Sequence, residues 1–282
     1  MKRILLATDL SEQCKFAHER AVALATSQGA ELRILHAHAA DASETELMVI
    51  TRIIENRTRD CSARHEHCEP DLTIQLSEAP KEEAIKNEIF DFNPDVVILG
   101  SHGEPRMRDA IFGTTATHLL RSTRCPILVV QNPVEGAYSK ALLAVDDAGS
   151  ARRLYPFAAE MDVKDEIYAV HACEPSLREL VDGDDTEAEA LAELKLAISE
   201  LAREQPESPQ PELFAYASQG DPMDVLQKCS REVSPDLIIM GSHGRSGFAR
   251  YLLGSYSDDM LLWCPADLLV VRVDVEEAAA AA

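Results

Sequence analysis

The sequence lacks the features that define several large classes of protein. None of its apolar runs approaches the roughly 20 residues of a membrane-spanning helix, so we expect no membrane insertion. The apolar run near the N-terminus ends at Asp9, too early for a signal peptide, and predicts a β-strand. The sequence contains no Gly-x-x-x-x-Gly-Lys-[Ser/Thr] phosphate loop, no Gly-x-Ser-x-Gly nucleophile elbow and no glycine-rich fingerprint after its first apolar run. These absences argue against the enzyme classes that use those motifs.

Positive charge is also scarce, because 49 acidic residues face 27 basic ones and the net charge is −22. Such a field repels phosphate backbones and anionic membrane surfaces, so we expect no nucleic-acid partner. ATP is an anion too, and a site for it must therefore rely on local backbone N–H donors. The seven cysteines are odd in number and irregularly spaced. Together with the missing signal peptide, they predict free thiols and a cytoplasmic location.

An internal repeat divides the chain into two halves. Residues 93–103 read almost like residues 234–244, about half the chain later. The similarity continues forward to a glycine–hydroxyl pair in each half and backward, with a small shift, to the first apolar run of each half. We therefore predict two domains, at residues 1–135 and 138–275, joined by a short segment that contains proline and glycine.

Within each half, apolar runs alternate with helical patterns. In the first half, we predict strands at residues 3–8, 31–37, 72–76, 96–99 and 126–130. We predict helices after a capping Ser11, after the capping box Ser43-x-x-Glu46, and at residues 82–92 and 114–122. This alternation favours a parallel sheet covered on both faces, which binds ligands at the carboxyl ends of its strands where the strand order reverses.

A glycine motif follows the fourth predicted strand of each half: Gly-x-x-Gly, nine residues, then glycine and a hydroxyl residue. Its members are Gly100, Gly103, Gly113 and Thr114 in the first half, and Gly241, Gly244, Gly254 and Ser255 in the second. The missing Cβ atoms let backbone N–H groups approach phosphate oxygens, and the helix that opens after the last glycine favours an anion. Asp9 and Asp146 end the first strands at the same edge, where a carboxylate can accept from ribose hydroxyls or help to hold Mg²⁺.

At these residues the sequence resembles the universal stress protein family, over nearly the whole chain and as two tandem family domains. The resemblance rests on the two aspartates, the glycine motif, and the pairs His36-Ala37 and His171-Ala172 at the end of the second strands. It implies two tandem open parallel five-stranded α/β sandwiches, Rossmann-like and of the adenine nucleotide alpha hydrolase-like type. It also implies ATP binding, with Ala37 and Ala172 beside the adenine, and pairing of the two domains through their last strands.

The nucleotide-binding residues that follow from the motif and the resemblance lie in both halves. In the first half they are Asp9, Ala37, Gly100, His102, Gly103, Gly113, Thr114 and Thr115. In the second half they are Asp146, Ala172, Gly241, His243, Gly244, Arg245, Gly254, Ser255, Tyr256 and Ser257. No residue is assigned to catalysis or to a metal site.

The family pattern is kept better in the second half than in the first. The glycine expected after the third strand is Gly220 in the second half but Ala79 in the first. The basic residue expected after the second glycine of the motif is Arg245 in the second half but Glu104 in the first, where two nearby arginines could compensate. We therefore expect the better site in the second half, and the first half could be a structural partner.

Two other residue patterns leave alternatives open. Cys61, His65 and Cys68 share a face of a predicted helix and could bind zinc, although known zinc spacings fit poorly and an exposed helix end with a half-buried thiol explains them as well. His102 and His243 could act as general bases, but neither has an evident nucleophile or orienting carboxylate, and a hydrogen bond that shapes the loop is the simpler role.

We expect a cytoplasmic stress-response protein that binds ATP or a related adenine nucleotide, with Mg²⁺ as a candidate companion ion, in one or both halves. Binding would order residues 100–114 and 241–255 and so switch a surface for a protein partner that the sequence does not identify. Without an activating lysine or a paired base, ATP hydrolysis would at most be slow. An interaction or chaperone-like protein with vestigial sites, a slow ATPase or AMP-producing hydrolase, and a homodimer all stay open.

Overall fold

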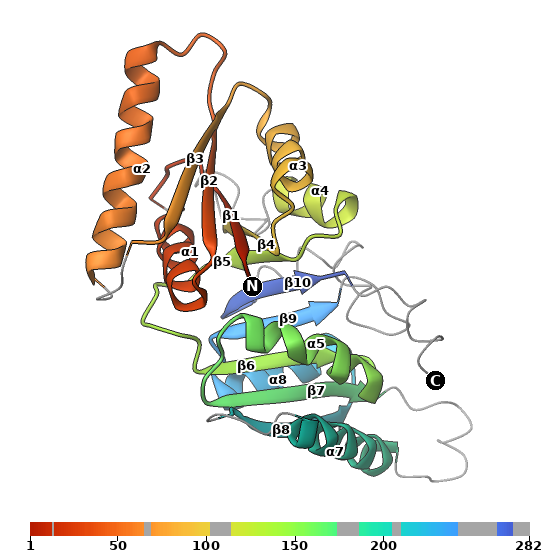
Figure 1. The fold of residues 1–282 in the computed structure, drawn as a ribbon. Coiled ribbons are helices and arrows are strands. Elements are labelled where there is room, and N and C mark those ends of the chain that lie inside the picture. The colour runs from red at the N-terminus through yellow and green to blue at the C-terminus, as the bar shows by residue number, and fades with distance from the viewer. Residues whose placement is uncertain are drawn as a thin grey trace. The chain divides into compact units, whose positions relative to one another are not determined.

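The computed structural model describes residues 1–12, 14–64, 69–101, 114–173, 186–204, 210–241 and 264–272. The chain divides into two compact units, Met1–Ala137 and Tyr138–Ala282, which we call unit 1 and unit 2 (Figure 1). Among the described helices, none is both long and apolar enough to cross a membrane.

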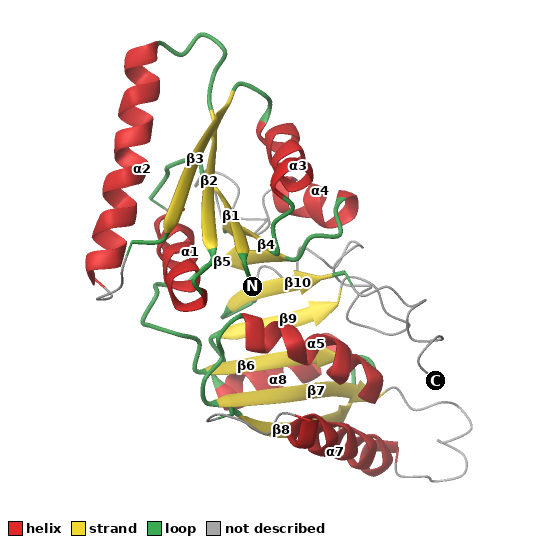
Figure 2. Ribbon diagram, in the orientation of Figure 1, coloured by secondary structure: helices red, strands yellow, loops and turns green. Residues whose placement is uncertain are grey.

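Unit 1 alternates strands and helices along the chain. Its elements are β1 (Arg3–Ala7), α1 (Cys14–Gln28), β2 (Glu31–Ala37), α2 (Glu44–Arg64), β3 (Asp71–Ser77), α3 (Lys81–Phe92), β4 (Val96–Gly100), α4 (Thr114–Ser122) and β5 (Ile127–Val130). The strands pair in parallel in the order β3-β2-β1-β4-β5. The helices α1 and α2 pack together, as do α3 and α4. The two pairs cover opposite faces of the sheet (Figure 2).

The described elements of unit 2 follow the same order. They are β6 (Lys140–Val145), α5 (Ala148–Glu160), β7 (Glu166–Cys173), α7 (Thr186–Glu204), β8 (Glu212–Gln219), α8 (Pro222–Val233), β9 (Leu237–Gly241) and β10 (Asp267–Val271). All described strand pairs are parallel, in the order β10-β9-β6-β7-β8. The predicted fold class, two tandem open parallel α/β sandwiches, is therefore confirmed.

Burial explains why the strands differ in pattern. The β1 residues Ile4, Leu5 and Leu6 are fully buried, because helices cover both faces of the central strands. The edge strand β3 has no fully buried residue: exposed and half-buried residues alternate over its first four positions, and its remaining residues are half-buried. The predicted caps are also present: the Cys14 N–H donates to the Ser11 Oγ (3.3 Å), and Ser43 and Glu46 form a reciprocal capping box.

One aspartate in each unit fastens the start of the first strand. In unit 1, the backbone N–H groups of Lys2 and Arg3 both donate to the Asp95 Oδ2, at 2.5 and 2.9 Å. In unit 2, two N–H groups at the start of β6 donate to Asp236 in the same way, at 2.8 and 3.0 Å. Partial burial acts to raise the pKa of Asp95, but these hydrogen bonds outweigh it and the pKa is lowered. The repeated Pro-Asp of the sequence is therefore a link between the starts of neighbouring strands.

We predict that Asp95→Ala and Asp236→Ala each lower the free energy of unfolding by about 1–3 kcal/mol, because each leaves two strand N–H groups without their acceptor. Urea unfolding measures this. Asp71 is an exposed aspartate at the start of β3, so Asp71→Ala is the matched control. This control should leave the urea midpoint of unfolding unchanged. A loss no larger than that of the control would contradict the assigned role.

A buried histidine joins α1 to α2 in unit 1. His18 is 1% exposed, and its Nε2 lies 2.9 Å from the Thr58 Oγ1. Burial, aided by the nearby positive charge of Arg57, lowers the pKa of His18 to about 4 from its ordinary 6.5. The neutral imidazole is therefore the form that the folded protein accommodates.

We predict that unit 1 loses stability as the pH falls from 6.5 to about 4. In this window, the unfolded chain binds a proton at His18 that the folded chain does not, so the free energy of unfolding decreases by roughly 3 kcal/mol in all. Urea unfolding as a function of pH should show a smaller decrease in His18→Gln than in the parent protein. His38→Gln is the control, and an identical pH profile for the two variants would refute this assignment.

Candidate functional site

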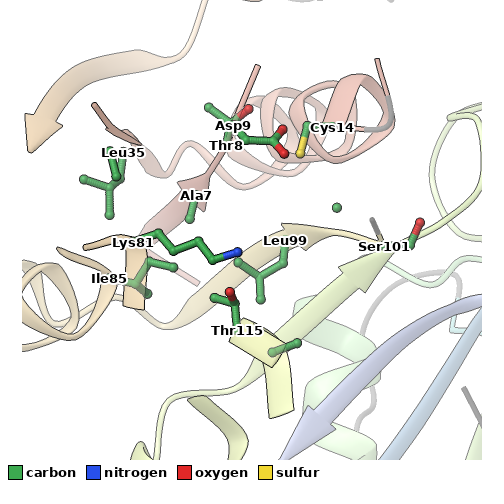
Figure 3. Close-up of a pocket in the computed structure, with 13 residues that line it drawn as sticks. Ala7, Thr8, Asp9, Cys14, Leu35, Lys81, Ile85, Leu99, Ser101 and Thr115 are labelled. Carbon is green, nitrogen blue, oxygen red and sulfur yellow. The ribbon is translucent and has the colours of Figure 1, made fainter. Parts of the chain in front are cut away.

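A pocket of about 190 Å³ lies at the carboxyl ends of β1, β2 and β4 in unit 1 (Figure 3). Residues near the starts of α1, α3 and α4 complete its described lining. The strand order reverses between β1 and β4, and such a point is where parallel sheets bind ligands. Pockets for whole drug-sized ligands measure roughly 300–1,000 Å³, so the pocket would enclose only part of a nucleotide.

Four of the residues predicted from the sequence meet in this pocket. Asp9, Ala37, Gly100 and Thr115 come from four different elements or the turns that follow them, and all line the same space. The large apolar side chains of the lining are Leu35 on β2, Ile85 on α3 and Leu99 on β4 (Figure 3). The arrangement can therefore enclose an apolar ring and present polar groups at its edge.

The shape of the pocket depends on how β1 ends. The His36 Nδ1 lies 2.9 Å from the carbonyl oxygen of Thr8. Since a carbonyl only accepts, the Nδ1 must carry the hydrogen. The Thr8 Oγ1 in turn accepts from the Leu10 N–H (3.0 Å), and Leu10 takes a left-handed backbone conformation with a φ of 63°. The chain thus turns sharply after β1 and leaves Asp9 at the mouth of the pocket.

Unit 2 uses the same device at the end of β6. The His171 Nδ1 lies 3.0 Å from the carbonyl oxygen of Val145, the residue before Asp146. The histidine of each His-Ala pair therefore fixes the end of the first strand, and the alanine follows it on the second strand. Sequence reasoning marked these pairs only through the family resemblance, whereas the structure gives the histidine a physical role.

Asp9 is held in its ionised form. Its Oδ1 accepts from the Ser11 N–H (2.9 Å), and the Cys14 thiol also donates to the carboxylate. Partial burial acts to raise the pKa of Asp9, but the hydrogen bonds from Ser11 and Cys14 outweigh it, so the pKa is lowered. A fixed carboxylate at this place can accept hydrogen bonds from hydroxyl groups or contact a cation.

Thr115 has a hydroxyl without a partner. Its Oγ1 is enclosed and forms no hydrogen bond in the described structure, although the residue lines the pocket from the first turn of α4. Buried hydroxyls nearly always have a hydrogen-bond partner, and the N–H groups of a helix start favour an anion. The unused hydroxyl therefore points to a polar ligand.

Sequence reasoning missed other pocket residues, above all Cys14 and Lys81. They are the first residues of α1 and α3, and neither belongs to a motif. The available signal was their place directly after a strand end, because helices that start there border the carboxyl edge of the sheet.

The remaining predicted residues are only partly described. In unit 2, Asp146 follows β6, Ala172 lies on β7 and Gly241 ends β9, all at the carboxyl edge of the sheet. Thr114 begins α4 in unit 1. Outside the described residues lie His102, Gly103, Gly113, His243, Gly244, Arg245, Gly254, Ser255, Tyr256 and Ser257. The better site expected in the second half thus stays a prediction.

The alternative of a zinc site also stays untested. Cys61 is buried on α2, where burial raises the pKa of its thiol to about 11. His65 and Cys68 fall outside the described residues. Among the residues that the structure describes, no three histidine, cysteine or acidic side chains are grouped as a metal site requires.

The sequence model of the universal stress protein family matches the chain twice, at residues 1–131 and 137–272. A universal stress protein of Mycobacterium tuberculosis is 28% identical over 187 residues, which are 63% of this chain and 62% of that protein. Universal stress protein E of Escherichia coli is 24% identical over 213 residues, 68% of this chain and 65% of that protein. The chain thus aligns with somewhat less than two thirds of the length of these relatives.

Solved structures share the fold over nearly the whole chain. The crystal structure of a universal stress protein from Archaeoglobus fulgidus has a TM-score of 0.63 at 18% identity, with 97% of each chain covered. A protein from Pseudomonas aeruginosa described as a putative universal stress protein has a TM-score of 0.61, with 96% of this chain and 93% of that chain covered. At 18% identity, both likenesses concern the fold alone.

We predict that Thr115→Val raises the free energy of unfolding by about 1 kcal/mol, because valine has the shape of threonine but buries no unpaired hydroxyl. Thermal unfolding without added ligand measures this. Thr51→Val is the matched control, because the Thr51 hydroxyl donates to the Leu47 carbonyl (2.9 Å) and its removal should not stabilise. A destabilised Thr115→Val would show that the hydroxyl already has a partner.

Proposed function

Because the chain belongs to the universal stress protein family, we propose that it binds ATP or a related adenine nucleotide at the strand-end crevice of one or both units. In this proposal, the bound nucleotide regulates how a stress-response protein interacts with a protein partner. One observation carries the proposal: the unit 1 pocket joins an ionised carboxylate, a partnerless hydroxyl and a helix start at the reversal point of the sheet.

The lining suits the three parts of a nucleotide, which are the base, the ribose and the phosphates. Ala37 has a small side chain, and with Leu35 and Leu99 it offers apolar surface for a flat base. Asp9 offers a carboxylate that can accept from ribose hydroxyls. The Thr115 hydroxyl and the first turn of α4 offer hydrogen-bond donors for a phosphate.

Mg²⁺ fits this donor set as a companion of the phosphates. Magnesium in proteins usually takes one or two carboxylates and completes its shell with water and phosphate oxygens. Asp9 is the carboxylate among the described lining residues, so it would be the protein ligand. The ion would neutralise phosphate charge and so reduce the repulsion between the nucleotide and a chain with a net charge of −22.

The proposed regulation rests on the position of the pocket. Gly100 ends β4 and Thr114 begins α4, so the two halves of the glycine motif flank the segment between them. A ligand bound to both ends would favour one arrangement of that segment. A nucleotide-dependent interaction surface follows, and hydrolysis is not required for it.

The test is mass spectrometry of small molecules released by mild heat or acid from freshly purified protein, for the parent, Gly113→Val and Gly254→Val. We expect an adenine nucleotide in the parent and its loss wherever the glycine of the working site is replaced, because a Cβ blocks the close approach of phosphate. If just one of the two variants loses the nucleotide, the working site lies in the unit that carries that substitution.

Two results would contradict the proposed function. If no sample contains nucleotide and none takes it up from a solution of ATP with Mg²⁺, the sites are vestigial and a partner-binding role replaces the proposal. If nucleotide binds and is turned over, and turnover disappears in Asp146→Asn, the protein is an enzyme instead of a binding protein.

A further inference from the structure

Lys81 is the basic side chain among the described residues that line the unit 1 pocket. It is the first residue of α3, and Figure 3 shows its side chain extended into the space bordered by Leu99 and Thr115. Lys81 is exposed and forms no ion pair with an acid in the described part of the chain. The next residue, Glu82, is engaged by the His118 Nδ1 at 3.0 Å. The ammonium group is therefore available to a ligand.

The position of Lys81 is unfavourable for the helix that carries it. A cation at a helix N-terminus opposes the helix dipole, and the N-cap residue, Pro80, makes no side-chain capping hydrogen bond. The corresponding helix of unit 2, α8, starts conventionally: the Asp221 side chain accepts from the Met223 N–H (2.9 Å), and Pro222 is its first residue. Unit 1 thus has a lysine where unit 2 has a better helix start.

We propose that Lys81 supplies the positive charge that binds the anionic group of the ligand in unit 1. It would replace the basic residue that follows the second glycine of the motif, which is Arg245 in the second half but Glu104 in the first. This proposal rests on nucleotide binding as proposed above. It adds that the unit 1 pocket selects phosphorylated ligands over the nucleoside through a side chain of α3.

The arrangement of charges supports this assignment. Asp9 reaches the pocket from the turn after β1 and Lys81 from α3, and the two carry opposite charges (Figure 3). A nucleotide has hydroxyl donors on its ribose and negative charge on its phosphates, so it can satisfy both groups at once. The enclosed Thr115 hydroxyl adds a hydrogen-bond donor on the side where the lysine ends.

The experiment measures the affinities of adenosine, AMP, ADP and ATP by calorimetry in a Gly254→Val background, which disables the motif of the second half. Lys81→Met should weaken the phosphorylated ligands roughly tenfold or more, because a hydrogen bond to a charged group is lost, and should leave adenosine unchanged. The affinity of Lys81→Met for ATP should also depend less on salt concentration than that of the background. Lys81→Arg should retain the preference for phosphorylated ligands.

Two controls keep the result interpretable. Lys86→Met removes the same charge from the same helix, but Lys86 contacts His118 (2.9 Å) and does not line the pocket, so its affinities should equal those of the background. Lys81→Met should be at least as stable as the background in urea, because the replaced cation opposes the helix dipole. A weakened affinity can then not be attributed to unfolding.

Four results would overturn the role of Lys81. Equal weakening of adenosine and ATP would mean that the lysine supports the base or the fold. An unchanged ATP affinity in Lys81→Met would place the cation elsewhere, with Arg106 and Arg108 as the next residues to replace. Binding in the parent but not in the Gly254→Val background would leave the proposed function to unit 2 alone. Absence of binding in the parent would refute the proposed function itself, and with it this proposal.

Discussion

The two ends of β1 are fixed by side chains from neighbouring strands, and the rest of unit 1 is built around that constraint. At its start, the Asp95 carboxylate binds two backbone N–H groups, and at its end the His36 imidazole binds the Thr8 carbonyl. Between these points, Ile4, Leu5 and Leu6 are fully buried, and the strand pairs with β2 and β4. Buried backbone groups must be paired, so the register of the sheet and the place where Asp9 leaves it are determined together.

Unit 2 keeps this constraint and changes what surrounds it. Asp236 and His171 hold β6 as their counterparts hold β1. The helix after the third strand, by contrast, begins with a capping aspartate and a proline in unit 2 and with Pro80 and Lys81 in unit 1. A duplicated fold can thus keep one scaffold while the start of a helix differs between its two copies, since helix starts are not needed to set the register of the sheet.

The unit 1 pocket contains groups that do not serve the stability of the fold. The Thr115 hydroxyl has no hydrogen-bond partner in the described structure, and the positive charge of Lys81 interacts unfavourably with the dipole of its own helix. Each costs stability in the empty protein, and each would be offset by a ligand that is anionic and accepts hydrogen bonds. Sites that bind ligands commonly keep such unfavourable local features.

The sequence alone determined the alternation of strands and helices, because hydrophobic period and capping residues are local signals. Residues 31–37 and 114–122, for example, were predicted with the limits that the structure shows for β2 and α4. The sequence also placed Asp9 at the carboxyl edge, since the ends of parallel strands meet there, whereas Ala37 and Thr115 followed from the family resemblance and the glycine motif. Only the tertiary structure decided that Lys81 enters the same pocket. No motif marks this lysine, and its position depends on how α3 packs on the sheet, which is set by contacts distant in the sequence.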